Sequence, residues 1–183
     1  MEANKDLWLA NIQEAIKQIK GEFSSLTQED LNFKVNPESW SIAENIQHLT
    51  LTANSYHKNF DEILSNQHTF GFLGKVKFLA NFFGKVILNS VEPSRKKKIR
   101  TFPLWDPTQS DLTSEIFVEF ENSQRALSTY IAKLEPFFGK NKMVASPANN
   151  KIVYPIETAL EIITQHNFRH INQAKEVKKD LKK

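Results

Sequence analysis

Five histidines carry most of the chemistry that this sequence offers, because the chain contains no cysteine. Without a thiolate, a transition-metal site has to be built from His, Asp or Glu side chains. His166 and His170 are four residues apart, a spacing that puts both imidazoles on one face of a helix, about 6 Å apart at Cβ. Such a pair suits two ligands of one metal ion. It is also found as a hydrogen-bonded core pair or as a wet surface pair, so both readings stay open at this point.

Apolar residues recur every three or four positions in four long segments, which predicts an all-α fold built as a four-helix bundle. The expected helices cover residues 5–23, 41–64 and 110–134, and residue 155 to the lysine-rich end. The second helix begins with a capping box, because the Ser41 hydroxyl can accept from the Glu44 backbone N–H while the Glu44 side chain reaches back. A role for Glu44 as a base is the alternative to this cap. His48 follows one turn later.

The connections between these helices differ in length. Residues 27–38 read as a connector. Between helices two and three we expect a long crossover, with a short or broken helix over residues 70–91 and then a loop over residues 91–109, which contains three prolines and a basic run. Residues 140–154 are predicted to form a second loop, and no segment shows a convincing strand pattern. The length suits one domain over residues 1–183.

Composition excludes some classes of protein. The net charge of +3 does not demand an acidic partner. The first residues lack the basic start and apolar stretch of a secretory signal, and no uncharged apolar run approaches the roughly 20 residues that span a bilayer. We therefore expect a cytoplasmic protein without a membrane span.

Two motifs together resemble those of the DinB-like metalloprotein superfamily. Residues 40–49, WSIAENIQHL, look like the family's Trp-Ser, helix start and His-Leu at the beginning of helix two. Residues 166–173, HNFRHINQ, look like its second motif, two histidines four apart followed by Gln. The order of the motifs and the long crossover between helices two and three also agree. The resemblance implies a bundle in which His48, His166 and His170 bind a divalent ion such as Zn, Ni or Fe.

Three neutral imidazoles leave such an ion with an open coordination position, as in catalytic rather than structural sites. That position could lower the pKa of a water or of a thiol. Helical geometry places Asn45 and Thr52 one turn either side of His48, and Gln173 one turn after His170, so these three are the expected pocket or supporting residues. His57 and His68 lack a matching spacing and are predicted to face solvent. No further catalytic residue can be assigned.

These observations support three hypotheses of function. The first is a metal-dependent enzyme acting on a small molecule, either a hydrolase or a thiol S-transferase using a low-molecular-weight thiol; the family includes thiol-dependent S-transferases and a maleylpyruvate isomerase. The second is a non-catalytic metal- or ligand-binding bundle of the stress response. The third, weaker, is a membrane-surface or nucleic-acid binder using the basic residues 95–100 and the lysine-rich end. A solvated surface explains these cations better, so no nucleic-acid partner is expected. The apolar segment around residues 70–83 suits core packing or a homodimer.

Overall fold

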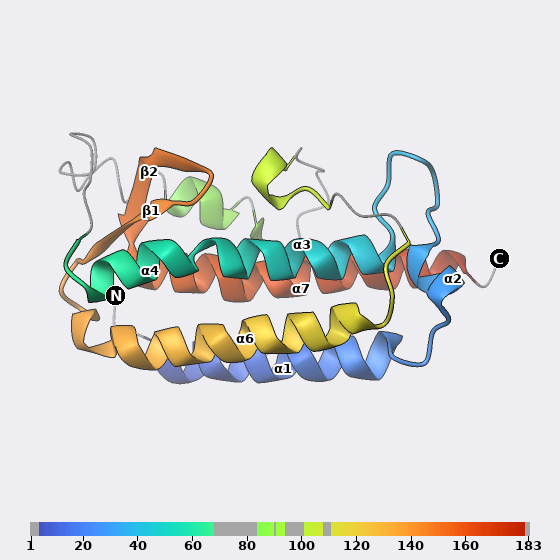
Figure 1. Cartoon of the computed structure of the whole chain (residues 1–183), viewed down its shortest axis with the longest axis horizontal. Coiled ribbons are helices and arrows are strands. Elements are labelled where there is room, and N and C mark those ends of the chain that lie inside the picture. Colours follow the sequence, from blue (N-terminus) through green and yellow to red (C-terminus); the bar gives the residue numbers. More distant parts are fainter. Residues whose placement is uncertain (1–3, 68–83, 90, 94–100, 108–110, 182–183) are drawn as a thin grey trace.

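A computed structural model describes residues 4–67, 84–89, 91–93, 101–107 and 111–181. This part of the chain is mostly helical, as predicted, with one small two-stranded sheet that was not (Figure 1). The helices are α1 (Lys5–Phe23), α2 (Gln28–Asn32), α3 (Ile42–Ser55), α4 (His57–Leu64), α6 (Glu115–Leu134) and α7 (Ile156–Asp180), with short 3-10 turns η2 (Pro103–Trp105) and η3 (Glu135–Phe137). The strands are β1 (Met143–Ser146) and β2 (Asn149–Pro155).

Helix α1 has the bounds that its apolar stripe predicts. Its buried side chains recur at spacings of three and four, so they form one face, and they are Trp8, Ile12, Ala15, Ile19 and Phe23. This face packs against α6 and α7. The long helices α1, α3, α6 and α7 lie side by side, with α3 next to α7 and α1 next to α6 (Figure 1).

The predicted second helix is divided. A capping box at Ser41 and Glu44 starts α3 as expected, but the helix ends at Ser55 and α4 begins at His57. The Thr52 hydroxyl donates to the His48 carbonyl and the Ser55 hydroxyl donates to the Thr52 carbonyl. Such back-bonding competes with the helix's own ladder and often bends it. The connector before α3 also contains the short helix α2, which starts at its own capping box of Thr27 and Asp30 and was not predicted.

Helix α6 begins at Glu115 rather than at Ser110, which lies outside the described residues. The side-chain amide of Asn32 holds Leu112 at both ends, accepting from its backbone N–H (2.8 Å) and donating to its carbonyl (2.7 Å). Asp111 adopts a positive φ of 62°. These contacts hold Leu112 against Asn32 of α2, and the left-handed conformation of Asp111 does not continue a right-handed helix, so α6 begins after both residues.

The loop predicted over residues 140–154 is wrong, because β1 and β2 form an antiparallel hairpin there. An isolated two-stranded hairpin is barely stable in water, and this one depends on contacts made elsewhere in the fold. Val144 and Tyr154 belong to the buried core. The Asn59 side chain of α4 donates to the Ala145 carbonyl (2.9 Å), and the Tyr154 hydroxyl pairs with that of Tyr56 (2.5 Å). Such long-range contacts leave no local sequence signal.

The crossover is described only in part. The predicted broken helix over residues 70–91 is helical at residues 84–89 and 91, while residues 70–83 and the basic residues 95–100 lie outside the described ranges. Gly84 approaches α7 so closely that a Cβ there would lie 2.9 Å from Thr158 Cγ2. The 3-10 turn η2, inside the predicted loop, packs against α3. Among the helices that the structure describes, none combines the length and the apolar character needed to cross a bilayer.

Candidate metal centre

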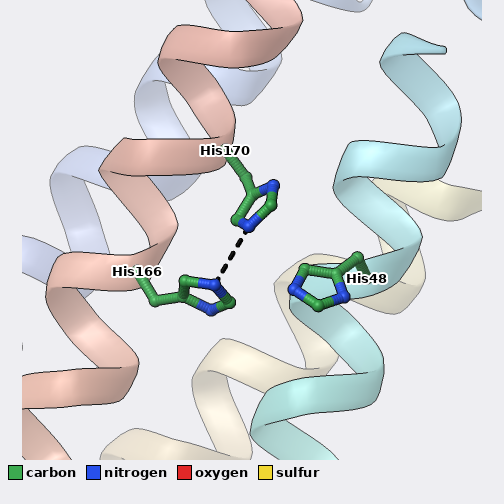
Figure 2. A group of neighbouring side chains, drawn as sticks. All are labelled: His48, His166 and His170. Carbon is green, nitrogen blue, oxygen red and sulfur yellow. Dashed lines mark hydrogen bonds between the residues drawn. The ribbon is translucent and has the colours of Figure 1, made fainter. Parts of the chain in front are cut away.

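Three histidine side chains from α3 and α7 converge between these two helices (Figure 2). His48 lies on the second turn of α3, at a height that the cap at Ser41 fixes. His166 and His170 lie one turn apart on α7. One ring nitrogen from each histidine lies within 4.8 Å of the corresponding nitrogens of the other two. The packing of α3 against α7 brings together His48 and the pair His166 and His170, which are more than a hundred residues apart in the sequence.

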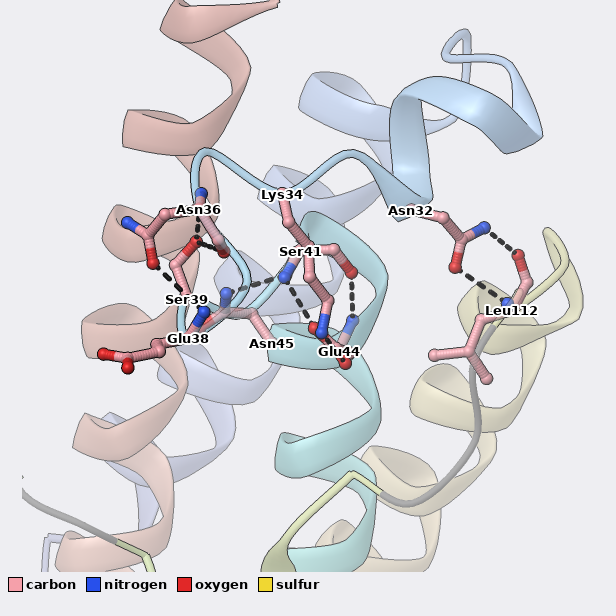
Figure 3. A network of polar contacts seen from close by, with 9 residues as sticks. All are labelled: Asn32, Lys34, Asn36, Glu38, Ser39, Ser41, Glu44, Asn45 and Leu112. Carbon is pink, nitrogen blue, oxygen red and sulfur yellow. Dashed lines mark hydrogen bonds and ion pairs between the residues drawn. The ribbon is translucent and has the colours of Figure 1, made fainter.

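The chain entering α3 is held by a network of polar contacts (Figure 3). The Ser41 hydroxyl accepts from the Glu44 backbone N–H (3.1 Å), and the Glu44 carboxylate accepts from the Ser41 backbone N–H (2.8 Å). The second carboxylate oxygen of Glu44 forms an ion pair with Lys34 (2.7 Å). Before the cap, the Ser39 hydroxyl donates to the Asn36 carbonyl. The capping role predicted for Glu44 is therefore confirmed, and its carboxylate is used in holding the start of α3.

The protonation state of His48 follows from a contact with the crossover. Its Nδ1 lies 2.6 Å from the backbone carbonyl oxygen of Trp105 in η2. A carbonyl can only accept, so Nδ1 carries the proton and donates. In a neutral imidazole the other nitrogen, Nε2, then has a lone pair. A backbone carbonyl is a common partner for the second nitrogen of a metal-binding histidine.

His170 is oriented by Asn45 on α3. The Asn45 amide nitrogen donates to the Ser41 carbonyl (2.8 Å), which assigns the amide oxygen to the His170 side. That oxygen lies 2.9 Å from His170 Nδ1, so Nδ1–H donates to it. The lone pair of His170 is therefore on Nε2. Of the three supporting residues predicted from helical spacing, Asn45 is the one that reaches a histidine side chain.

The two histidines of α7 approach each other closely. Nε2 of His166 lies 3.0 Å from Nε2 of His170. Two lone pairs at that distance repel, so the two nitrogens must share either a proton or a cation. Ligand nitrogens lie about 2.0–2.1 Å from a zinc ion, which separates any two of them by roughly 3–4 Å. The observed spacing fits a shared cation, and the donor set of three imidazoles suits a transition metal.

Burial keeps all three imidazoles neutral. It lowers the pKa of His48 to about 4, while the contact with the Trp105 carbonyl and the nearby Asp106 carboxylate act in the opposite direction. Burial also holds the pKa values of His166 and His170 well below their ordinary value, and the positive charge of Arg169 lowers them further. A metal ion binds imidazole in its neutral form, so these side chains are ready to bind at neutral pH without first losing a proton.

Trp40 covers the group on one side. Its indole lies against His48, with ring centroids 4.7 Å apart, and against His170, at 5.6 Å. His48 is 2% exposed and His170 is 6% exposed, whereas His166 is partly exposed. Access to the three nitrogens is therefore restricted, and His166 lies at the more open side.

The two other predicted pocket residues, Thr52 and Gln173, lie on the helices that carry the histidines. Thr52 is buried, but its hydroxyl donates to the carbonyl of His48 on its own helix (2.8 Å). Gln173 is half-buried, and His170 Nδ1 is bonded to Asn45.

Of the two remaining histidines, His57 is described by the structure and is not part of the group. His57 was expected to face solvent, but it is half-buried and packs on Tyr130, with ring centroids 5.0 Å apart. His68 lies outside the described residues. The residue that sequence reasoning missed is Trp105, because only the folded crossover brings its carbonyl to His48. Its position between Pro103 and Pro107 indicated a turn but not the contact.

A family model described as the DinB superfamily matches residues 11–174. The match covers most of the chain and includes α3, most of α7 and all three histidines of the group. The search of curated proteins found no match, and neither did the search of solved structures.

Proposed function

The chain belongs to the DinB superfamily, and we propose that it holds one divalent metal ion on His48, His166 and His170. The observation that carries this proposal is the convergence of three neutral imidazoles within 4.8 Å, two of them with Nδ1–H fixed by an acceptor so that Nε2 has the lone pair. All-nitrogen ligation suits Zn, Ni or Fe better than Mg or Ca. We also infer that the four long helices form a four-helix bundle within a single domain over residues 1–183, with the long crossover between α4 and α6.

We further propose that the protein is a metal-dependent enzyme that acts on a small molecule, as a thiol S-transferase or a hydrolase. Three protein ligands leave a coordination position for substrate or water, as in catalytic zinc sites. A bound ion would supply Lewis acidity, which lowers the pKa of a water or thiol at that position. The residues of the chain keep the ligands neutral and fix two of the three rings, and Trp40 limits the access of water.

A non-catalytic metal- or ligand-binding role in the stress response is the second candidate. The almost complete burial of His48 and His170 beneath Trp40 favours it, because a covered ion is harder for a substrate to reach. The partly exposed His166 favours the enzyme.

The metal content of the protein tests the site. Elemental analysis of untagged protein is expected to find about one ion per chain, and His48→Ala and His170→Ala are each expected to lose nearly all of it, because two remaining ligands hold an ion weakly. His57→Ala is the matched control, since His57 lies on α4 outside the group, and it should keep its metal. A native protein that takes up no Zn, Ni or Fe after reconstitution would show that the histidines are only core polar residues.

Activity separates the two candidate functions. Metal-loaded protein is given a low-molecular-weight thiol with electrophilic acceptors and, separately, a panel of small esters and amides. Turnover that disappears in His170→Ala but persists in His57→Ala supports the enzyme. Stoichiometric metal without turnover, and without an exchangeable water on the ion, supports the binding role.

A further inference from the structure

We propose that Trp105 is a positioning residue for the histidine group: its backbone carbonyl selects the tautomer and orientation of His48, and its indole anchors that carbonyl to α3. The expected effect on metal affinity rests on the proposed metal site, but the positioning of His48 can be tested without a metal.

The contact between the two residues is short and long-range. The Trp105 carbonyl accepts from His48 Nδ1–H at 2.6 Å, across 57 positions of sequence. If Nδ1 instead lost its proton, two acceptors would face each other at that distance. The carbonyl therefore requires Nδ1–H and leaves the lone pair on Nε2, the nitrogen able to turn toward His166 and His170.

The indole of Trp105 fixes the carbonyl through a second bond to the same helix. Its Nε1–H donates to the Ser55 hydroxyl at 2.9 Å. The proton of that hydroxyl is already used, because Ser55 donates to the Thr52 carbonyl at 2.7 Å. The oxygen of Ser55 therefore presents its lone pairs to the indole. Trp105 thus bonds to α3 at two points, seven residues or about two turns apart.

The surrounding turn limits how far Trp105 can move. Pro103 begins η2, where the fixed φ of proline suits the first position of a helical turn. Trp105 N–H donates to the Phe102 carbonyl (2.9 Å), and the Phe102 ring meets the indole edge-on with centroids 5.6 Å apart. The turn is therefore stabilised by contacts between Phe102 and Trp105 as well as by the bonds to α3.

His48 differs in this respect from His170. The partner of His170, Asn45, is on α3 itself, so it is present whenever α3 and α7 pack together. The partner of His48 comes from the crossover, which has to dock before the ring is fixed. The crossover thereby contributes to the metal site without supplying a ligand.

The tautomer of His48 provides the direct test. In full-length protein labelled with 15N-histidine and treated with chelator, the nitrogen shifts of His48 should report a proton on Nδ1. Trp105→Ala should give a mixture of tautomers, and Trp105→Phe, which keeps an aromatic ring but loses the N–H, should give an intermediate result. Leu104→Ala is the matched control, because Leu104 lies in the same turn and is 52% exposed; it should behave as the native protein.

Zinc titration against a competing chelator gives the consequence. Partners of this kind typically contribute 10–100-fold to metal affinity, so Trp105→Ala should weaken zinc binding by about that factor. Ser55→Ala and Trp105→Phe should each weaken zinc binding by roughly 3–10-fold. The double variant should be little worse than either single variant, because both substitutions remove the same hydrogen bond, that between the indole and Ser55. If Trp105→Ala does not fold, Ser55→Ala and Trp105→Phe test the positioning role of Trp105 instead.

A native tautomer in the variants, or unchanged zinc affinity beside a folded circular dichroism spectrum, would overturn the proposal. A native protein with the Nδ1–H tautomer but no zinc binding would instead refute the metal site while leaving the positioning of His48 intact. The two failures are therefore distinguishable.

Discussion

Helices α1 and α3 are both amphipathic, but they use burial for different purposes. The buried side chains of α1 are all apolar, whereas those of α3 include the polar or ionisable residues Glu44, Asn45, Gln47, His48, Thr50 and Thr52. Helix α1 packs on α6 and α7, while α3 packs on both of these and also on α2 and η2. A helix covered on more sides has to bury polar groups as well, and each such group needs a partner.

The partners in α3 follow a pattern that α1 lacks. Thr50 and Thr52 donate to carbonyls of their own helix. Asn45 and His48 instead bond to groups from α7 and η2. Each of these two hydrogen bonds between elements fixes the orientation of a histidine ring, that of His170 or that of His48. In this molecule the buried face of α1 is apolar core, whereas α3 also contributes His48 and Asn45 to the histidine group that it forms with α7.

Removing core volume from α1 should have the largest effect on stability. Ile12 is completely buried, and Ile12→Ala is expected to lower the free energy of unfolding by about 2–5 kcal/mol, because it removes methyl groups and leaves a cavity. Urea unfolding measures this change. Zinc affinity of the folded variant should equal that of the native protein. Leu7→Ala, at a half-exposed position of the same helix, should cost less than about 0.5 kcal/mol. A loss of zinc affinity in the folded Ile12→Ala variant would show that α1 also supports the metal site, contrary to the contrast drawn with α3.

Acid should destabilise the histidine side of the molecule. Burial lowers the pKa of His48 from 6.5 to about 4, so the unfolded chain takes up this proton first as the pH falls. The contribution of His48 to the free energy of unfolding, about 3 kcal/mol, is fully present above about pH 6.5 and is lost as the pH falls to about 4. His166 and His170, with pKa values also lowered, act with the same sign. Urea unfolding in chelator at several pH values measures the slope, and His48→Gln should flatten it. An unchanged slope would mean that His48 is protonated as easily folded as unfolded.

Removing the partner of His170 should have a smaller effect, confined to the site. Asn45→Ala leaves His170 Nδ1–H without its acceptor and is expected to weaken zinc binding by about 10–100-fold. Asn54→Ala, at an exposed position of the same helix, is the control and should bind zinc as the native protein does. Competition with a chromophoric chelator measures both. If the two variants bound zinc equally well, Asn45 would contribute to the fold and not to the metal site, and the contrast drawn between α3 and α1 would fail.

Local patterns were sufficient for the parts of the fold that depend on neighbouring residues. The stripe of α1 predicted both of its ends, and the capping box at Ser41 predicted the start of α3. The hairpin of β1 and β2 was missed because it is stabilised by Tyr56 and Asn59, which are far away in sequence. The start of α6 was misplaced because Asn32 holds Leu112 outside the helix.

The site divides in the same way. The spacing of His166 and His170, and the motif containing His48, predicted which histidines lie together. Asn45 was expected near the group because it is one turn from His48, although its contact is with His170. Trp105 left no signal, since its contact depends on how the crossover docks. Residues that orient a site from another element are therefore harder to predict than the residues they orient.

The position of the tryptophans gives the protein an intrinsic optical reporter. Of its three tryptophans, Trp40 packs on His48 and His170, and the backbone carbonyl of Trp105 is bonded to His48. Trp8 is buried in the apolar core formed with α4 and the hairpin. Filling the site with a quenching ion such as cobalt should dim the emission of Trp40 and Trp105 while Trp8 remains as an internal reference. Site occupancy can then be followed in unlabelled protein, on the timescale of mixing.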